Sequence, residues 1–127
     1  MATILIVEDC VIIQMSYASD LKEHTVLKAL SIDSAQTLFE KFRETIDIIV
    51  FDGYIGNSGS KHTTIKLASK IREVGFKGPM IAASSDVDMR YALAKQGGCS
   101  HSIRESKDEI PEIIQLILSQ KDLPPTL

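Results

Sequence analysis

Acidic residues end two apolar runs that lie far apart in the sequence. Glu8 and Asp9 follow the run Ile4–Val7, and Asp52 follows the run Ile48–Phe51. Carboxylates without histidine or cysteine beside them are typical ligands of a hard cation, Mg²⁺ above all. A carboxylate can also accept a phosphoryl group and form an acyl phosphate. If the fold brings the three acids together, we expect a magnesium site in which Asp52 is the nucleophile.

Two more polar residues follow later apolar runs. Ser84 comes directly after Met80–Ala83 and could donate its hydroxyl to a phosphoryl oxygen. Arg104 ends the run Cys99–Arg104 and could supply a cation. Taken singly, such a residue is more often a turn former or a helix cap. It is the coincidence at the ends of three or four runs, in the right order, that favours a common site.

Strands and helices must position these residues. Short apolar runs without alternation are typical of strands covered on both faces, as in a parallel sheet. Helical faces recur between the runs at spacings of three and four residues, and Gly97–Gly98 ends a weaker fourth helix. Ser34 is the expected cap of the second helix. The predicted strands are Ile4–Val7, Ile48–Phe51 and Met80–Ala83, with His24–Leu30 and Cys99–Arg104 as more polar candidates. The helical faces are Ile13, Tyr17 and Leu21; Ala35, Leu38, Phe39 and Phe42; Leu67, Ala68, Ile71 and Val74; and Ile110, Ile113, Ile114, Ile117 and Leu118.

Strand and helix thus alternate five times, which predicts an α/β fold with a doubly wound parallel sheet. Ligands of such sheets gather at the carboxyl ends of the strands. The acids therefore lie where a site is expected. We expect one domain over residues 1–121 and a C-terminal tail over 122–127, because Pro124 and Pro125 cannot continue a helix.

Composition excludes several classes of function. With 127 residues and a formal net charge of −3, the chain has one domain's length and no basic surface for nucleic acid or an anionic membrane. No apolar run has the length of a bilayer span. Cys10 and Cys99 show no metal spacing and are expected to be reduced thiols in a cytoplasmic protein. The three histidines are scattered, so no zinc site is predicted.

The whole chain resembles the receiver domain of two-component response regulators. The resemblance rests on "ILIVED" with the acid pair, "IIVFD" with the acceptor, "GPMIAAS" with Ser84, and "GGCSHSIR". It implies a flavodoxin-like three-layer sandwich with strand order 2-1-3-4-5. It also implies that Asp52 receives a phosphoryl group from a histidine kinase or a histidine phosphotransfer protein. Mg²⁺ would be held by Glu8, Asp9, Asp52 and the backbone carbonyl of Tyr54.

The chain departs from the family near the end of the fifth strand and after Asp52. The family has a lysine, usually followed by proline, where this chain has Arg104 and Glu105, and Lys107 lies three residues on. His101 takes the place of a common aromatic residue. The loop "GYIGNSGSKHTT" is longer than usual. Arginine is no simple substitute for lysine, so we expect phosphorylation with weak coupling to the fourth helix and fifth strand.

Smaller expectations concern the acyl phosphate and its readers. Tyr54 is bulky enough to shield the phosphoryl group from water, and Asp86 could orient or repel that water. The resemblance implies a downstream protein partner that binds the fourth helix, fifth strand and fifth helix, near Tyr91 and His101.

Three functions remain open on the sequence. The leading one is a stand-alone phosphoreceiver, which is no enzyme and signals through partner binding. The second is a pseudo-receiver that binds partners without phosphorylation; Arg104 and His101 support it. The third is a Mg²⁺-dependent phosphohydrolase, disfavoured because no second acid stands two residues after Asp52 and no insertion is large enough for a cap.

Overall fold

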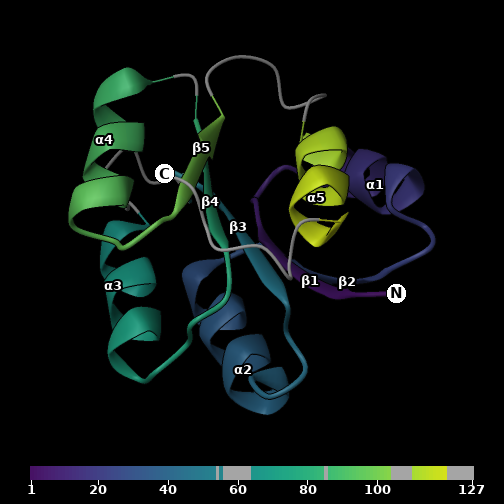
Figure 1. The fold of residues 1–127 in the computed structure, drawn as a ribbon, viewed down its shortest axis with the longest axis horizontal. Coiled ribbons are helices and arrows are strands. Elements are labelled where there is room, and N and C mark those ends of the chain that lie inside the picture. The colour runs from purple at the N-terminus through teal and green to yellow at the C-terminus, as the bar shows by residue number, and fades with distance from the viewer. Residues whose placement is uncertain (54, 56–63, 85, 104–109, 120–127) are drawn as a thin grey trace.

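Strands and helices alternate throughout the described part of the computed structural model, which comprises residues 1–53, 55, 64–84, 86–103 and 110–119 (Figure 1). The strands are β1 (Thr3–Val7), β2 (Thr25–Ala29), β3 (Ile48–Asp52), β4 (Met80–Ala83) and β5 (His101–Ile103). The helices are α1 (Val11–Asp20), α2 (Ile32–Phe42), α3 (Ile65–Glu73), α4 (Val87–Lys95) and α5 (Ile110–Ser119). All five predicted strands are present. The second is one residue shorter at each end than expected, and the fifth begins at His101 rather than at Cys99.

The strands form one parallel sheet in the order β2-β1-β3-β4-β5. Val7 pairs with Ala29 on one side and with Phe51 on the other, and Asp52 pairs with Ala83. The carboxyl ends of the central strands therefore meet at one edge. This confirms the doubly wound fold and the strand order that the family resemblance implied.

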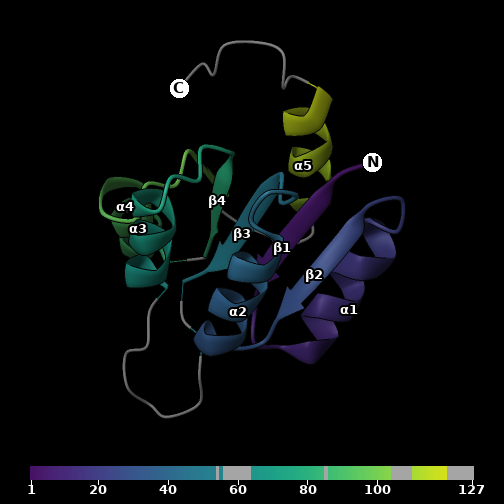
Figure 2. The same ribbon diagram turned by 90° about the horizontal axis from the view of Figure 1, so that it is seen from below.

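Helices cover both faces of the sheet and make three layers (Figures 1 and 2). Helices α1 and α5 lie on one face, and α2, α3 and α4 lie on the other. Successive strand residues enter opposite cores: Leu5 and Val7 pack beneath α2, α3 and α4, whereas Ile4 and Ile6 pack beneath α1 and α5. A strand covered on both faces must be apolar at every position, which explains the runs without alternation.

Two sequence expectations need correction. Ser31, not Ser34, caps α2: its hydroxyl accepts the Ser34 N–H at 3.0 Å. Ser34 instead completes a capping box, because its own hydroxyl accepts the Ser31 N–H at 3.1 Å. Val74 does not share the buried face of Leu67 and Ile71: it lies past the end of α3 and is 43% exposed.

The boundary between domain and tail stays a prediction, because residues 120–127 lie outside the described part. None of the described helices is long and apolar enough to cross a membrane.

Candidate functional site at the carboxyl ends of the strands

The three predicted acids lie together. Glu8, Asp9 and Asp52 each offer a carboxylate oxygen, and these oxygens all lie within 4.8 Å of one another. The Glu8 side chain is buried, whereas Asp9 and Asp52 are partly exposed. The cluster therefore has a buried floor and an accessible rim.

Backbone hydrogen bonds fix Glu8 at the bottom of the cluster. Its N–H donates to the Ala29 carbonyl at 3.0 Å and extends the β1–β2 ladder by one residue. Its Oε2 accepts the Cys10 N–H at 3.1 Å, at the start of α1. A carboxylate near a helix N-terminus is favoured by the helix dipole. Glu8 is thus held by the chain on both sides.

Gln14 supports this corner from below, a role that was not predicted from the sequence. It is 1% exposed, and its Nε2 lies 2.8 Å from the Ile6 carbonyl oxygen, 3.0 Å from that of Glu8 and 3.2 Å from that of Ala29. The buried amide thus supplies N–H groups to backbone carbonyls at the ends of β1 and β2. The sequence did contain a sign of this role: Gln14 is the one polar residue of the apolar segment "VIIQM".

Thr64 performs a similar task beneath Asp52. Its hydroxyl donates to the Asp52 carbonyl at 2.7 Å, and its N–H donates to the Gly53 carbonyl at 3.1 Å. Thr64 is completely buried and directly precedes α3. It anchors the backbone on which the proposed nucleophile stands, a role that no sequence pattern revealed.

Ser84 lies at the end of the neighbouring strand. It follows Ala83, which pairs with Asp52, and it is 7% exposed. Its Oγ accepts the Asp86 N–H at 3.2 Å, which leaves the hydroxyl proton available for an acceptor. Asp86 in turn caps α4 by accepting the Asp88 N–H at 2.9 Å. Asp86 thus has a structural task at the start of α4, and its expected effect on water stays a prediction.

The remaining predicted residues divide into two groups. Tyr54 and Arg104, with Glu105 and Lys107, lie outside the described residues. His101 opens β5, is partly buried, and places Nδ1 2.9 Å from the Ser100 hydroxyl. Burial lowers the pKa of its imidazole below the usual value, which favours the neutral ring at neutral pH.

The donor set fits Mg²⁺. Three carboxylates this close repel one another, and a divalent cation relieves that repulsion. All three ligands are oxygens, and Mg²⁺ keeps several waters when carboxylates supply only part of its shell. The exposed rim of Asp9 and Asp52 suits such a partly hydrated ion.

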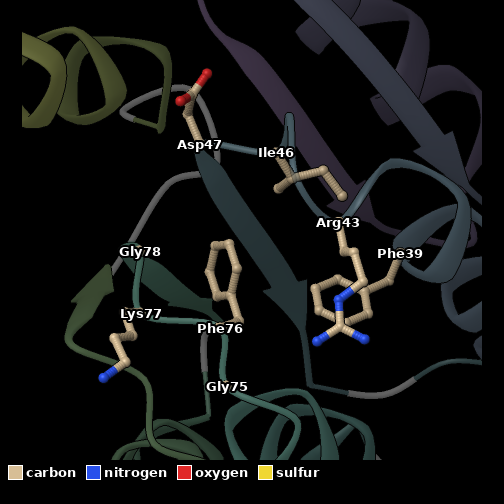
Figure 3. A pocket seen from close by; sticks show the side chains of 8 residues that line it. All are labelled: Phe39, Arg43, Ile46, Asp47, Gly75, Phe76, Lys77 and Gly78. Atoms are coloured by element: carbon tan, nitrogen blue, oxygen red, sulfur yellow. The ribbon is translucent and has the colours of Figure 1, made fainter.

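A cavity of about 320 Å³ lies elsewhere, at the amino ends of the strands. Figure 3 shows Phe39, Arg43 and Phe76 around it, with Asp47 at the start of β3. Asp52 ends the same strand. The cavity and the acids therefore belong to opposite ends of the sheet, and the cavity takes no part in the acidic site.

Comparison with known proteins supports the fold assignment. No protein-family model and no curated protein matches the chain. Among solved structures, a response regulator receiver domain protein from Clostridium thermocellum has a TM-score of 0.78 at 20% identity, over 97% of this chain and 98% of that one. A chemotaxis protein from Vibrio cholerae has a TM-score of 0.75 at 18% identity, over 94% and 98%.

A third neighbour is the response regulator protein TrrA from Thermotoga maritima in complex with Mg²⁺ and BeF. It has a TM-score of 0.73 at 21% identity, over 92% of this chain and 99% of that one. The chain has the fold of receiver domains, which confirms the predicted resemblance in structure.

Proposed function

We propose that this protein, which has the receiver-domain fold, is a response regulator receiver that accepts a phosphoryl group on Asp52. The donor would be a histidine kinase or a histidine phosphotransfer protein, and Mg²⁺ would be required. The observation that carries the proposal is the clustering of Glu8, Asp9 and Asp52 within 4.8 Å at the carboxyl edge of the sheet.

The transfer makes one bond and breaks one. An Asp52 carboxylate oxygen attacks the phosphorus, the bond from phosphorus to the donor's imidazole nitrogen breaks, and the nitrogen recovers a proton from solvent. Mg²⁺, held by Glu8, Asp9, Asp52 and the Tyr54 carbonyl, would neutralise charge on the phosphoryl oxygens. Thr64 keeps the Asp52 backbone in place through its 2.7 Å hydrogen bond.

Two further residues would bind the phosphoryl oxygens. The Ser84 hydroxyl already accepts the Asp86 N–H, so its proton can be donated to a phosphoryl oxygen. Arg104 is the proposed cation of the fifth strand, in place of the family's lysine. A downstream protein would read the phosphorylated form at α4, β5 and α5, where Val87 and Tyr91 are 63% and 65% exposed.

Incubation with acetyl phosphate and Mg²⁺, followed by intact mass, tests the proposal. We expect the addition of one phosphoryl group that hydroxylamine removes, as an acyl phosphate requires, and none when EDTA replaces Mg²⁺. An acid-stable adduct would indicate a phosphorylated hydroxyl instead. An unmodified chain under all conditions would favour the phosphorylation-independent pseudo-receiver.

A further inference from the structure

Helix α4 packs directly against the residue that follows Asp52. A Cβ atom built on Gly53 would lie 2.1 Å from Met89 Cγ and 3.0 Å from Met89 Sδ, and its three nearest atoms all belong to Met89. Met89 is 6% exposed and belongs to the core beneath α2, α3 and α4. The side chain of Met89 thus occupies the space that the missing side chain of Gly53 leaves.

This contact leaves little tolerance. Gly53 does not adopt a positive φ, so its backbone admits any residue and only the contact with Met89 requires glycine. The clash would involve Cγ near the base of the Met89 side chain, so its relief needs a χ1 rotation or a movement of α4. A displacement of the Gly53 backbone would act on α4 through the same contact, because a close-packed interior is hard to compress and transmits strain.

The same turn of α4 also holds the neighbouring strand end. Arg90 Nη1 donates to the Ser84 carbonyl at 2.6 Å. Met89 and Arg90 are consecutive, yet one contacts the residue after β3 and the other the residue after β4. Both of these strand ends carry groups of the candidate site, Asp52 and Ser84. One helical turn therefore contacts the backbone on both sides of that site.

The opposite side of α4 faces solvent. Val87 and Tyr91, four residues apart on the helix, are the exposed apolar pair described above. Met89 and Leu93 form the inner side and are buried. If a push on Met89 shifts α4, Val87 and Tyr91 therefore move relative to the rest of the surface.

We infer that Met89 is a positioning residue that couples the state of Asp52 to the outer side of α4 through Gly53. The inference rests on the proposed function, because phosphorylation supplies the change at Asp52. It gives α4 a connection to the acceptor that does not pass through the fifth strand, where arginine replaces lysine. Such coupling is reciprocal: whatever fixes α4 also changes the affinity of the Asp52 site for a phosphoryl analogue.

The contact itself is tested by a double-mutant cycle on melting temperature, without any ligand. Gly53→Ala should lower the melting temperature of the otherwise wild-type chain and should cost clearly less in the Met89→Ala background. Additive losses would show that Gly53 and Met89 do not interact, and would overturn the inference.

The coupling is tested with Mg²⁺ and beryllofluoride, a stable phosphoryl analogue, by amide chemical shifts at Asp52 and Tyr91. In wild type both amides should shift. In Met89→Ala the Asp52 shift should persist while the Tyr91 shift falls to less than half, and Met89→Leu should restore it by preserving side-chain volume. Leu93→Ala, which opens a cavity one turn away, is the control for a loosened core and should keep the Tyr91 shift.

Two contrary results are distinguishable. A full Tyr91 shift in Met89→Ala overturns the inference and leaves the proposed function intact. The absence of any shift at Asp52 in wild type contradicts the proposed function, and the inference fails with it. If Met89→Ala does not fold, Met89→Val in the same measurement should show an intermediate Tyr91 shift, and an undiminished one would overturn the inference.

Discussion

The two ends of the sheet use charged side chains in different ways. At the amino end, the Arg72 guanidinium donates to the carbonyls of Gly98, Phe76 and Gly78 at 3.0, 2.9 and 2.8 Å. At the carboxyl end, three carboxylates are gathered within 4.8 Å. Arg72 satisfies carbonyls that the turns before β4 and β5 leave without strand partners. Carboxylates gathered this closely repel one another.

The difference distinguishes charged side chains that stabilise the fold from charged side chains that form the candidate site. Arg72 also lies 5.8 Å from the Phe76 ring centroid, and Phe76 packs edge-on against Phe39 at 5.9 Å. These contacts cover the amino-end side of the core beneath α2, α3 and α4. The acids make the opposite arrangement, with like charges placed where a cation and a phosphoryl group could relieve them. The amino end should therefore affect stability, and the carboxyl end should affect chemistry.

The largest expected effect uses two aspartates at opposite ends of β3: Asp47 directly precedes the strand, and Asp52 is its last residue. Asp52→Asn should abolish labelling by acetyl phosphate, since an amide is no nucleophile for phosphorus. Asp47→Asn, at the amino end, is the matched control: Asp47 Oδ2 accepts the Thr3 N–H at 2.9 Å, and an amide oxygen can replace it. Intact mass measures both. Labelling that persists in Asp52→Asn would place the acceptor elsewhere.

The second effect concerns stability at the amino end. Arg72→Ala removes three hydrogen bonds to partly buried carbonyls and should lower the free energy of unfolding by roughly 2–3 kcal/mol. Arg43→Ala removes one bond, to the Val74 carbonyl at 2.7 Å on the surface, and should cost about 0.5–1 kcal/mol. Urea denaturation measures both, and the folded variants should label like wild type. Equal losses of unfolding free energy in the two variants, or loss of labelling in folded Arg72→Ala, would contradict the division between a stabilising amino end and a reactive carboxyl end.

Sequence reasoning predicted the fold well because its signals were local and repeated. Runs such as Ile48–Phe51 must be apolar at every position when helices cover both faces. The acids were found for the same reason, since each directly follows such a run. Gln14 and Thr64 were missed, because their task depends on which carbonyls lie within reach, and reach is set by tertiary packing. The Gly53–Met89 contact joins residues 36 positions apart (89 − 53) and has no signature in either segment.

The smallest effect concerns the two cysteines, one at each end. Burial raises the pKa of the Cys99 thiol to about 12, and the nearby Arg72 guanidinium acts in the opposite direction. Cys99 should stay a protonated, unreactive thiol at pH 8, whereas partly exposed Cys10 should react with iodoacetamide. Because the folded-state pKa is the higher one, the stability that Cys99 contributes is complete below about pH 9 and declines as pH rises toward 12.

Peptide mapping of the alkylated folded chain checks this expectation. Modification confined to Cys10 is the predicted pattern, and Cys99 should become reactive only after denaturation. Rapid alkylation of Cys99 at pH 8 would show that the amino end opens more readily than its packing indicates.

A magnesium titration followed by amide resonances tests the central claim most directly, because it reads both ends of the sheet in one experiment. We predict saturable shifts of Glu8, Asp9 and Asp52 at millimolar Mg²⁺, no comparable shifts of Arg43, Asp47 and Lys77, and loss of the response in Asp9→Ala. An unchanged spectrum at the three acids, or equal shifts at both ends, would contradict the assignment of the carboxyl end as the functional site.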